Sequence, residues 1–258
     1  MQRAGLSEST IRGAYTTLHK VLTSAAKKQM LRRNWAAEVE RPTVTAHEAT
    51  SLDAVQLQAL LKAAEASGSR YALLFQLLAL TGLRRGEALA LRWESIRPDG
   101  KPVIRVSGTL ARIDGVLVVT QPKTSNSRRD LFITKPIDAV LRALKQRQRK
   151  EQLKAGSLWT STGYVFTTET GQPCDPRNAL RALHSAATKA GLSGVGLHTL
   201  RHTAATLMLG AGVPILTVSG QLGHYSVSIT GDVYGHVSDE ASASAMGALA
   251  KAVAGSQR

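Results

Sequence analysis

One stretch decides the fold: residues 71–87, with the sequence YALLFQLLALTGLRRGE. Its first ten residues are apolar almost all round a helix, which predicts a central helix buried in the core of a helical domain. Arg84 and Glu87 then follow at the start of a new helix, one turn apart. Because they directly follow a buried helix, Arg84 and Glu87 are the first candidates for a functional site. A surface ion pair of little consequence explains them equally well when they are taken alone.

Helical patterns lie on both sides of this stretch. We predict helices that run through residue 61 from a cap at 51–53, and at residues 136–153, 176–189, 200–209, 214–221 and 238–254. Between residues 103 and 133 the sequence changes to β-branched runs around a turn at Asp114-Gly115. The sequence therefore predicts a mainly α fold with a small antiparallel β-sheet, of the α+β class.

The N-terminal residues have a different organisation. Ser7 fits a helix cap, and apolar residues follow at helical spacing, with a second short helix expected around Ala36. A polar stretch with a proline at residues 41–50 is typical of a linker. We therefore divide the chain into residues 1–45 and 46–258. One amphipathic helix and a fragment cannot close a core, so residues 1–45 are expected to be part of a larger helical domain.

Composition and charge limit the class of protein. The 258 residues are 43% apolar, which is enough for one ordinary domain and a smaller piece. Lys and Arg number 33 against 18 Asp and Glu, a formal net charge of +15, which favours a polyanion such as nucleic acid over an anionic membrane surface. No apolar run reaches the roughly 18–20 residues of a membrane span, so we predict a cytoplasmic protein. Cys174 is the single cysteine, which excludes an internal disulfide.

Two further clusters carry polar residues that need an explanation. Residues 121–129, QPKTSNSRR, form a basic turn that contains Lys123, and such turns are usually just solvated. His198 and Arg201 lie one helical turn apart and can converge on a single anion. His198 and His202 have the spacing of a zinc site, but Thr199 stands where zinc proteases need a glutamate. That substitution argues against a metal.

The last cluster contains His224 and, ten positions later, Tyr234. A tyrosine is ordinarily a core residue, but together the four clusters supply two arginines, a lysine, two histidines and a tyrosine. These are what metal-free attack on a phosphodiester requires. Arginines stabilise a dianionic transition state, a phenol can attack and leave with equal ease, and a lysine or histidine can protonate the departing sugar oxygen.

In this order, over residues 6–237, the clusters resemble those of the tyrosine recombinases of the phage-integrase type. The resemblance implies catalytic roles for Arg84, Lys123, His198, Arg201, His224 and Tyr234, with Glu87 as the acidic residue that supports Arg84. It implies cleavage and rejoining of DNA through a 3′-phosphotyrosyl link at Tyr234, with no cofactor, metal or ATP. Gly220 and Gly231 stand where the family more often has helix formers or larger residues.

The resemblance also implies partners. These are double-stranded DNA at a recombination core site, a homo-tetramer on that DNA in the nucleoid, and accessory DNA-bending or directionality proteins. Residues 6–42 resemble the second half of the family's core-binding domain, which indicates an N-terminal truncation. Two alternatives stay open. A type IB topoisomerase shares the chemistry, and a truncated prophage remnant would bind DNA without recombining it.

Overall fold

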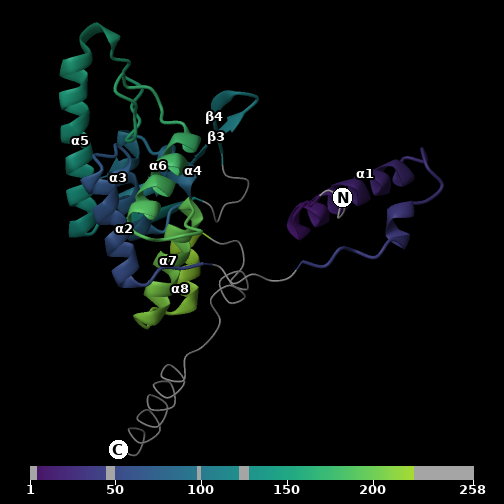
Figure 1. The fold of residues 1–258 in the computed structure, drawn as a ribbon. Coiled ribbons are helices and arrows are strands. Elements are labelled where there is room, and N and C mark those ends of the chain that lie inside the picture. The colour runs from purple at the N-terminus through teal and green to yellow at the C-terminus, as the bar shows by residue number, and fades with distance from the viewer. Residues whose placement is uncertain (1–4, 45–49, 98–99, 122–127, 224–258) are drawn as a thin grey trace, which may run out of the picture. The chain divides into compact units, whose positions relative to one another are not determined.

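The computed structural model describes residues 5–44, 50–97, 100–121 and 128–223 (Figure 1). The chain divides into two compact units, Met1–Glu48 and Ala49–Arg258. The helix predicted at residues 238–254 lies outside the described residues.

The first unit contains one long helix, α1 (Glu8–Lys27), and a short 3-10 helix, η2 (Trp35–Glu38). Ser7 caps α1 as predicted, because its hydroxyl accepts from the backbone N–H of Thr10 at 3.3 Å. The Tyr15 hydroxyl joins the two helices by donating to the carbonyls of Ala36 at 3.0 Å and Val39 at 3.1 Å. Within residues 5–44, Ala36 is the one buried residue. The described part of this unit therefore has almost no buried core of its own.

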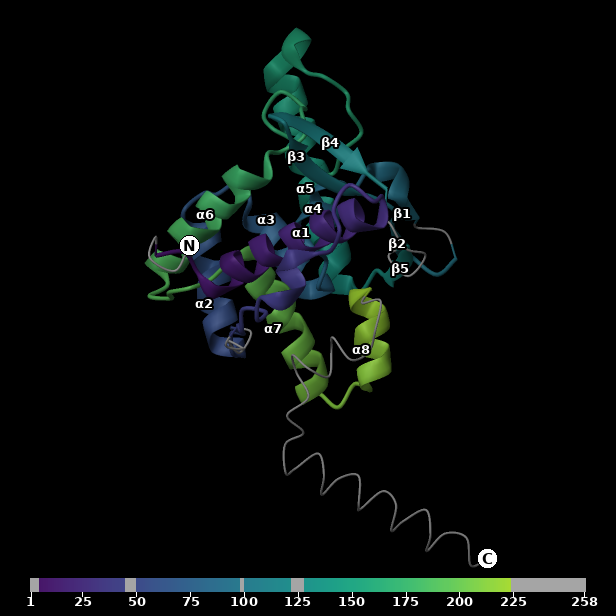
Figure 2. The same cartoon turned by 90° about the vertical axis from the view of Figure 1, so that its right-hand side faces the viewer.

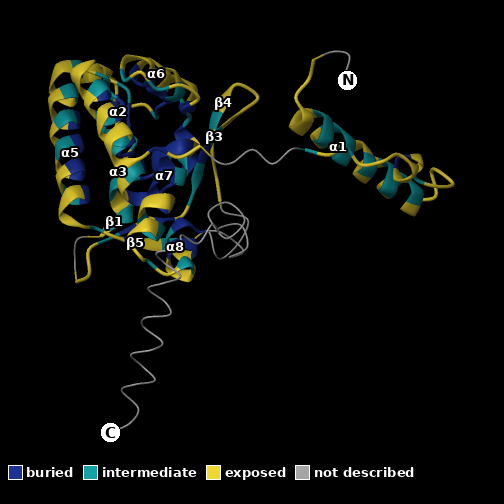
Figure 3. Ribbon diagram, turned by 60° about the horizontal axis from the view of Figure 1, so that its bottom comes forward, coloured by how far each residue is buried: buried dark blue, intermediate teal, exposed yellow. Residues whose placement is uncertain are grey.

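The second unit is built around α3 (Ala72–Thr81), in which six of ten residues are buried. This confirms the predicted central helix, and Figure 3 shows the buried residues gathered inside the unit. Helix α3 packs against α5 and α7, and α2 packs against α6. The remaining helices are α2 (Ala54–Ala66), α4 (Arg85–Leu89), η3 (Trp93–Ser95), α5 (Lys135–Ala155), η5 (Gly156–Leu158), α6 (Pro176–Lys189), α7 (Leu197–Gly210) and α8 (Ile215–Leu222). No helix in the described part of the chain is long and apolar enough to cross a membrane.

The strands form two small antiparallel sheets, where the sequence predicted one. Strands β1 (Ile96–Arg97), β2 (Val103–Val106) and β5 (Arg129–Phe132) pair in that order, whereas β3 (Thr109–Ile113) pairs with β4 (Val116–Thr120) in a separate two-stranded sheet. There are two sheets because β2 pairs with β5, which is distant in the sequence, rather than with the neighbouring β3. This pairing places Ile104 of β2 opposite Leu131 of β5, and both side chains are buried. The β3–β4 hairpin, which turns at Asp114 and Gly115 as predicted, projects from the unit (Figures 1 and 2). The α+β class is confirmed.

Helix α7 begins three residues earlier than its predicted start at residue 200. Gly196 is its N-cap, and the backbone N–H of Gly196 donates to the Thr199 hydroxyl at 3.0 Å. The predicted helix, 200–209, does not include this capping turn. Because α7 begins earlier, His198 lies in its first turn, and Arg201 lies one turn further on the same helix.

Candidate active site

The turn between α3 and α4 places Arg84. Gly82 ends α3 with a φ of 64°, a left-handed conformation that glycine adopts without strain. A Cβ atom at this position would lie 2.5 Å from Cδ2 of Leu222, so a side chain would also push against α8. The tight turn puts Arg84 at the N-cap of α4 and Glu87 three positions later.

Glu87 is the centre of a buried network, since the residue is only 3% exposed. Its Oε2 accepts from the backbone N–H of Arg84 at 2.8 Å, and its Oε1 accepts from Nη1 of the same arginine at 2.9 Å. Arg129 donates through Nη1 to Oε1 at 3.2 Å and through Nη2 to Oε2 at 2.9 Å. Four donors match the roughly four acceptor positions of a carboxylate.

These contacts fix the charge of Glu87. Burial by itself raises the pKa of its carboxyl group, but the hydrogen bonds and charge of Arg129, followed by those of Arg84, outweigh burial and hold that pKa below its ordinary value. Glu87 is therefore an anion at neutral pH. The Arg129–Glu87 pair is buried on both sides, and removing one partner from such a pair costs about 3–5 kcal/mol.

Helix α7 brings Arg201 and His198 close to the turn between α3 and α4. Arg201 is 4% exposed, and its Nη1 donates to the Gly82 carbonyl at 2.8 Å. His198 is an exposed residue, yet partial burial of its ring lowers its pKa. The positive charges of Arg201, Arg85 and Arg84 lower it further. Its imidazole is therefore neutral at pH 7 and lies within the field of three guanidinium groups.

The end of α8 also reaches this cluster. Arg129 donates through Nε to the Gln221 carbonyl at 2.7 Å, and Arg84 donates through Nη2 to the Gly223 carbonyl at 3.2 Å. The last carbonyls of a helix have no partner within the helix and carry partial negative charge, so guanidinium groups suit them. The chain leaves α8 directly beside Arg84.

The structure therefore brings together four of the residues singled out in the sequence: Arg84, Glu87, His198 and Arg201. Lys123, His224 and Tyr234 lie outside the described residues. Arg129 also belongs to this network, although in the sequence it stands out only as part of a basic turn. Strand alternation is the signal that was available, because Arg129 shares a face of β5 with the buried Leu131.

Chemically, the cluster is a site for an anion. Arg84 and Arg129 contact the Glu87 carboxylate, while the positive charges of Arg84, Arg85 and Arg201 act on His198. Fixed guanidinium charges with planar donor geometry suit a phosphate or another oxyanion.

His198 and His202 have the sequence spacing of a zinc site. Their ring centroids lie 6.3 Å apart, and burial also lowers the pKa of His202. Among the described residues, no group of three or more histidine, cysteine or acidic side chains is arranged to hold a metal ion.

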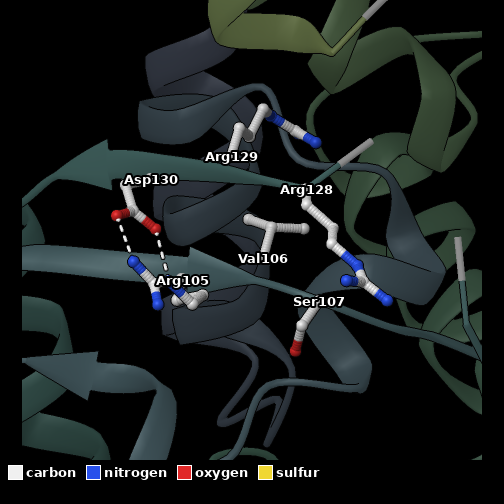
Figure 4. A pocket seen from close by; sticks show the side chains of 6 residues that line it. All are labelled: Arg105, Val106, Ser107, Arg128, Arg129 and Asp130. Atoms are coloured by element: carbon white, nitrogen blue, oxygen red, sulfur yellow. Dashed lines mark hydrogen bonds and ion pairs between the residues drawn. The ribbon is translucent and has the colours of Figure 1, made fainter. Parts of the chain in front are cut away.

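A surface pocket beside β2 and β5 lies close to the cluster without coinciding with it (Figure 4). Among the described residues of the Glu87 network, Arg129 is the one that also lines the pocket. The lining residues are Arg105, Val106, Ser107, Arg128, Arg129 and Asp130.

Comparison with known proteins gives a consistent result. Residues 50–241 match the model of the phage integrase family. A tyrosine recombinase XerC-like protein of Caldanaerobacter subterraneus is 38% identical over 182 residues, which cover 66% of this chain and 46% of the relative. The ICEBs1 integrase of Bacillus subtilis is 28% identical over 92% of this chain and 64% of its own length. The chain thus spans about half to two thirds of these relatives.

Solved structures show the same fold. The Tn1549 transposon integrase in complex with a circular intermediate DNA superposes with a TM-score of 0.79 at 19% identity, covering 95% of this chain and 81% of that one. The XerH site-specific recombinase bound to palindromic difH substrate superposes with a TM-score of 0.68 at 19% identity, over 94% and 68% of the two chains.

Proposed function

This chain belongs to the phage integrase family, and from that premise we propose that it is a site-specific tyrosine recombinase that cleaves and rejoins double-stranded DNA. The observation that carries the proposal is the convergence of Arg84 and Arg201, from different helices, on the turn at Gly82, with His198 beside them. The relatives named as recombinases and integrases support it.

The arginines account for binding and for stabilisation of the transition state. Attack on a phosphodiester adds negative charge to the non-bridging oxygens, and guanidinium groups held by buried contacts need no reorganisation to meet that charge. Glu87 keeps the Arg84 side chain in place, and the Gly82 carbonyl does so for Arg201. In this proposal His198 and His224 assist the two arginines at the phosphate.

Tyr234 is the proposed nucleophile. Its phenolic oxygen bonds to phosphorus and loses its proton to a base, for which the neutral His198 is suited, while the bond from phosphorus to the 5′ oxygen breaks. Lys123 gives a proton to that oxygen. The products are a 3′-phosphotyrosyl link and a free 5′ hydroxyl. Attack by a 5′ hydroxyl from a partner strand reverses the step without ATP or metal.

The assembly is part of the same proposal. Residues 46–258 form the catalytic domain, and residues 1–45 form part of a core-binding segment that grips DNA. A homo-tetramer on the recombination site in the nucleoid, with accessory DNA-bending or directionality proteins, would complete strand exchange.

Covalent capture tests the function without knowledge of the target site. The full chain is incubated with nicked duplexes that have a randomised central segment, and adducts that resist detergent are isolated and sequenced. We expect an adduct at the 3′ phosphate, and transfer of the strand to a second duplex. Rejoining only the original strand would instead indicate a type IB topoisomerase. DNA binding without an adduct would indicate a DNA-binding remnant of an integrase.

A further inference from the structure

Two neighbouring residues of β5 take part in guanidinium–carboxylate pairs that differ in burial. Arg105 donates through Nε and Nη2 to the two carboxylate oxygens of Asp130, at 2.9 and 2.8 Å, and these side chains are 46% and 38% exposed. In the Arg129–Glu87 pair the side chains are 8% and 4% exposed. Figure 4 shows Arg129 pointing away from the Arg105–Asp130 pair. Both arginines donate two hydrogen bonds to one carboxylate, so the exposed pair serves as a control for the buried one.

Arg129 uses all three of its side-chain nitrogens. Its two terminal nitrogens donate to Glu87 on α4, and its Nε donates to the Gln221 carbonyl at the end of α8. One side chain on β5 therefore links two other elements. A lysine can supply the charge, but its single nitrogen cannot reproduce this planar fork.

The end of α8 is fitted closely to this guanidinium. Gly223 has a φ of 70°, and a Cβ atom there would lie 2.7 Å from Nη1 and 3.0 Å from Cζ of Arg129. The Gly223 carbonyl accepts from Arg84. The C-terminal end of α8 is thus held at two carbonyls, Gln221 by Arg129 and Gly223 by Arg84, and His224 is the next residue in the sequence.

We propose that Arg129 is a positioning residue that ties the end of α8, and hence the start of the segment containing His224 and Tyr234, to the carboxylate that holds Arg84. Its role in catalysis rests on the proposed recombinase function. Loss of the fork would shift Arg84 and the end of α8 relative to each other while leaving both arginines of the proposed phosphate site, Arg84 and Arg201, in the chain.

The test compares Arg129→Lys with Arg105→Lys, which makes the same change in the exposed pair on the same sheet. We expect Arg129→Lys to lower the single-turnover rate of adduct formation about ten- to a hundredfold, the usual scale for misplaced catalytic groups. Its affinity for the captured duplex, measured by mobility shift, should stay at the wild-type value. Arg105→Lys should match the wild type in both measurements. An Arg129→Lys rate within twofold of wild type would overturn the proposal.

Folding is measured in parallel by thermal unfolding. If Arg129→Lys does not fold, Gly223→Ala disturbs the same contact from the other side, and a slow rate with normal affinity in that variant supports the proposal. Failure of both variants to fold would show a purely structural role and overturn it. In a double variant the two changes should not add, because they remove one contact.

Amide hydrogen exchange separates this proposal from the proposed function. If the wild-type chain forms no adduct with any duplex, the recombinase function fails, but the link to α8 can still be measured. We then expect faster exchange at the Gly223 amide, which donates to the Ser219 carbonyl, in Arg129→Lys and not in Arg105→Lys. Equal exchange in the two variants would overturn the positioning role.

Discussion

Helices α1 and α3 differ in how far the rest of the chain buries them. Helix α1 has 20 residues, all described and none buried, whereas α3 has ten residues of which six are buried. The packed core around α3 fixes the turn that carries Arg84 and the contact that holds Arg201. Transition-state stabilisation needs groups fixed in advance, while phosphate contacts that provide affinity tolerate mobile side chains. We therefore expect the second unit to determine the rate and the first to contribute to affinity.

The largest expected effect comes from the proposed nucleophile. Tyr234→Phe removes only the phenolic oxygen, so covalent adduct formation should be abolished while DNA binding stays near the wild-type level. Adduct is measured on a denaturing gel and binding by mobility shift. An adduct that survives in Tyr234→Phe would show that another residue attacks the phosphate.

The next largest effect concerns the two arginines held at the Gly82 turn. Arg84→Ala and Arg201→Ala should each lower the cleavage rate at least about a hundredfold, the usual scale for loss of one transition-state charge contact. Replacement by lysine should rescue poorly, because the planar donor geometry is lost. Single-turnover rates at saturating DNA measure the effect. Full activity in Arg201→Lys would contradict a role for the guanidinium fork.

The difference between the two units also shows what sequence can predict. The buried helix, the cap at Ser7 and the helix at 176–189 follow from patterns within one segment, and the structure confirms them. The number of sheets was wrong because the pairing of β2 with β5 joins residues far apart in the chain. Local alternation cannot determine such a partner.

The same limit applies to the candidate site. The spacing of Arg84 and Glu87, and of His198 and Arg201, is local and was visible in the sequence. Arg129 reaches Glu87 across 42 positions and Gln221 across 92, and nothing in the basic turn specifies either contact. Alternation with Leu131 predicts an inward-pointing arginine, which requires a buried partner. It does not identify that partner.

Acid should lower the free energy of unfolding of the second unit even when no DNA is bound. Burial lowers the pKa of His198 and His202 from 6.5, so the unfolded chain binds protons that the folded chain does not. The stability from this difference is present above pH 6.5 and is lost as the pH falls through the lowered values. Glu87, with a pKa lowered from 4.5, adds a further loss at lower pH.

The measurement is the Tm of the second unit as a function of pH. We expect the wild-type Tm to fall below pH 6.5, and His202→Gln to flatten that fall. His184→Gln changes an exposed histidine on α6 and should keep the wild-type profile. A wild-type Tm that is unchanged from pH 7 to pH 5 would contradict the assignment of neutral, partly buried histidines.

The smallest expected effect lies in the first unit, where substitutions should weaken DNA binding without lowering the cleavage rate. Lys20 and Lys27 are exposed on α1 and lie seven residues apart, which places them on one face of the helix. If both contact phosphates, the double variant Lys20→Gln/Lys27→Gln should make the slope of log affinity against log salt shallower by about 1.8, since each lost contact contributes about 0.9. The single-turnover cleavage rate at saturating DNA should not change, because no group of the arginine cluster is altered.

The matched control, Lys150→Gln/Lys154→Gln, removes two exposed lysines from α5, which packs on α3 (Figure 1). The comparison would fail if the α1 and α5 variants changed the salt slope equally, or if the α1 variant slowed cleavage at saturating DNA.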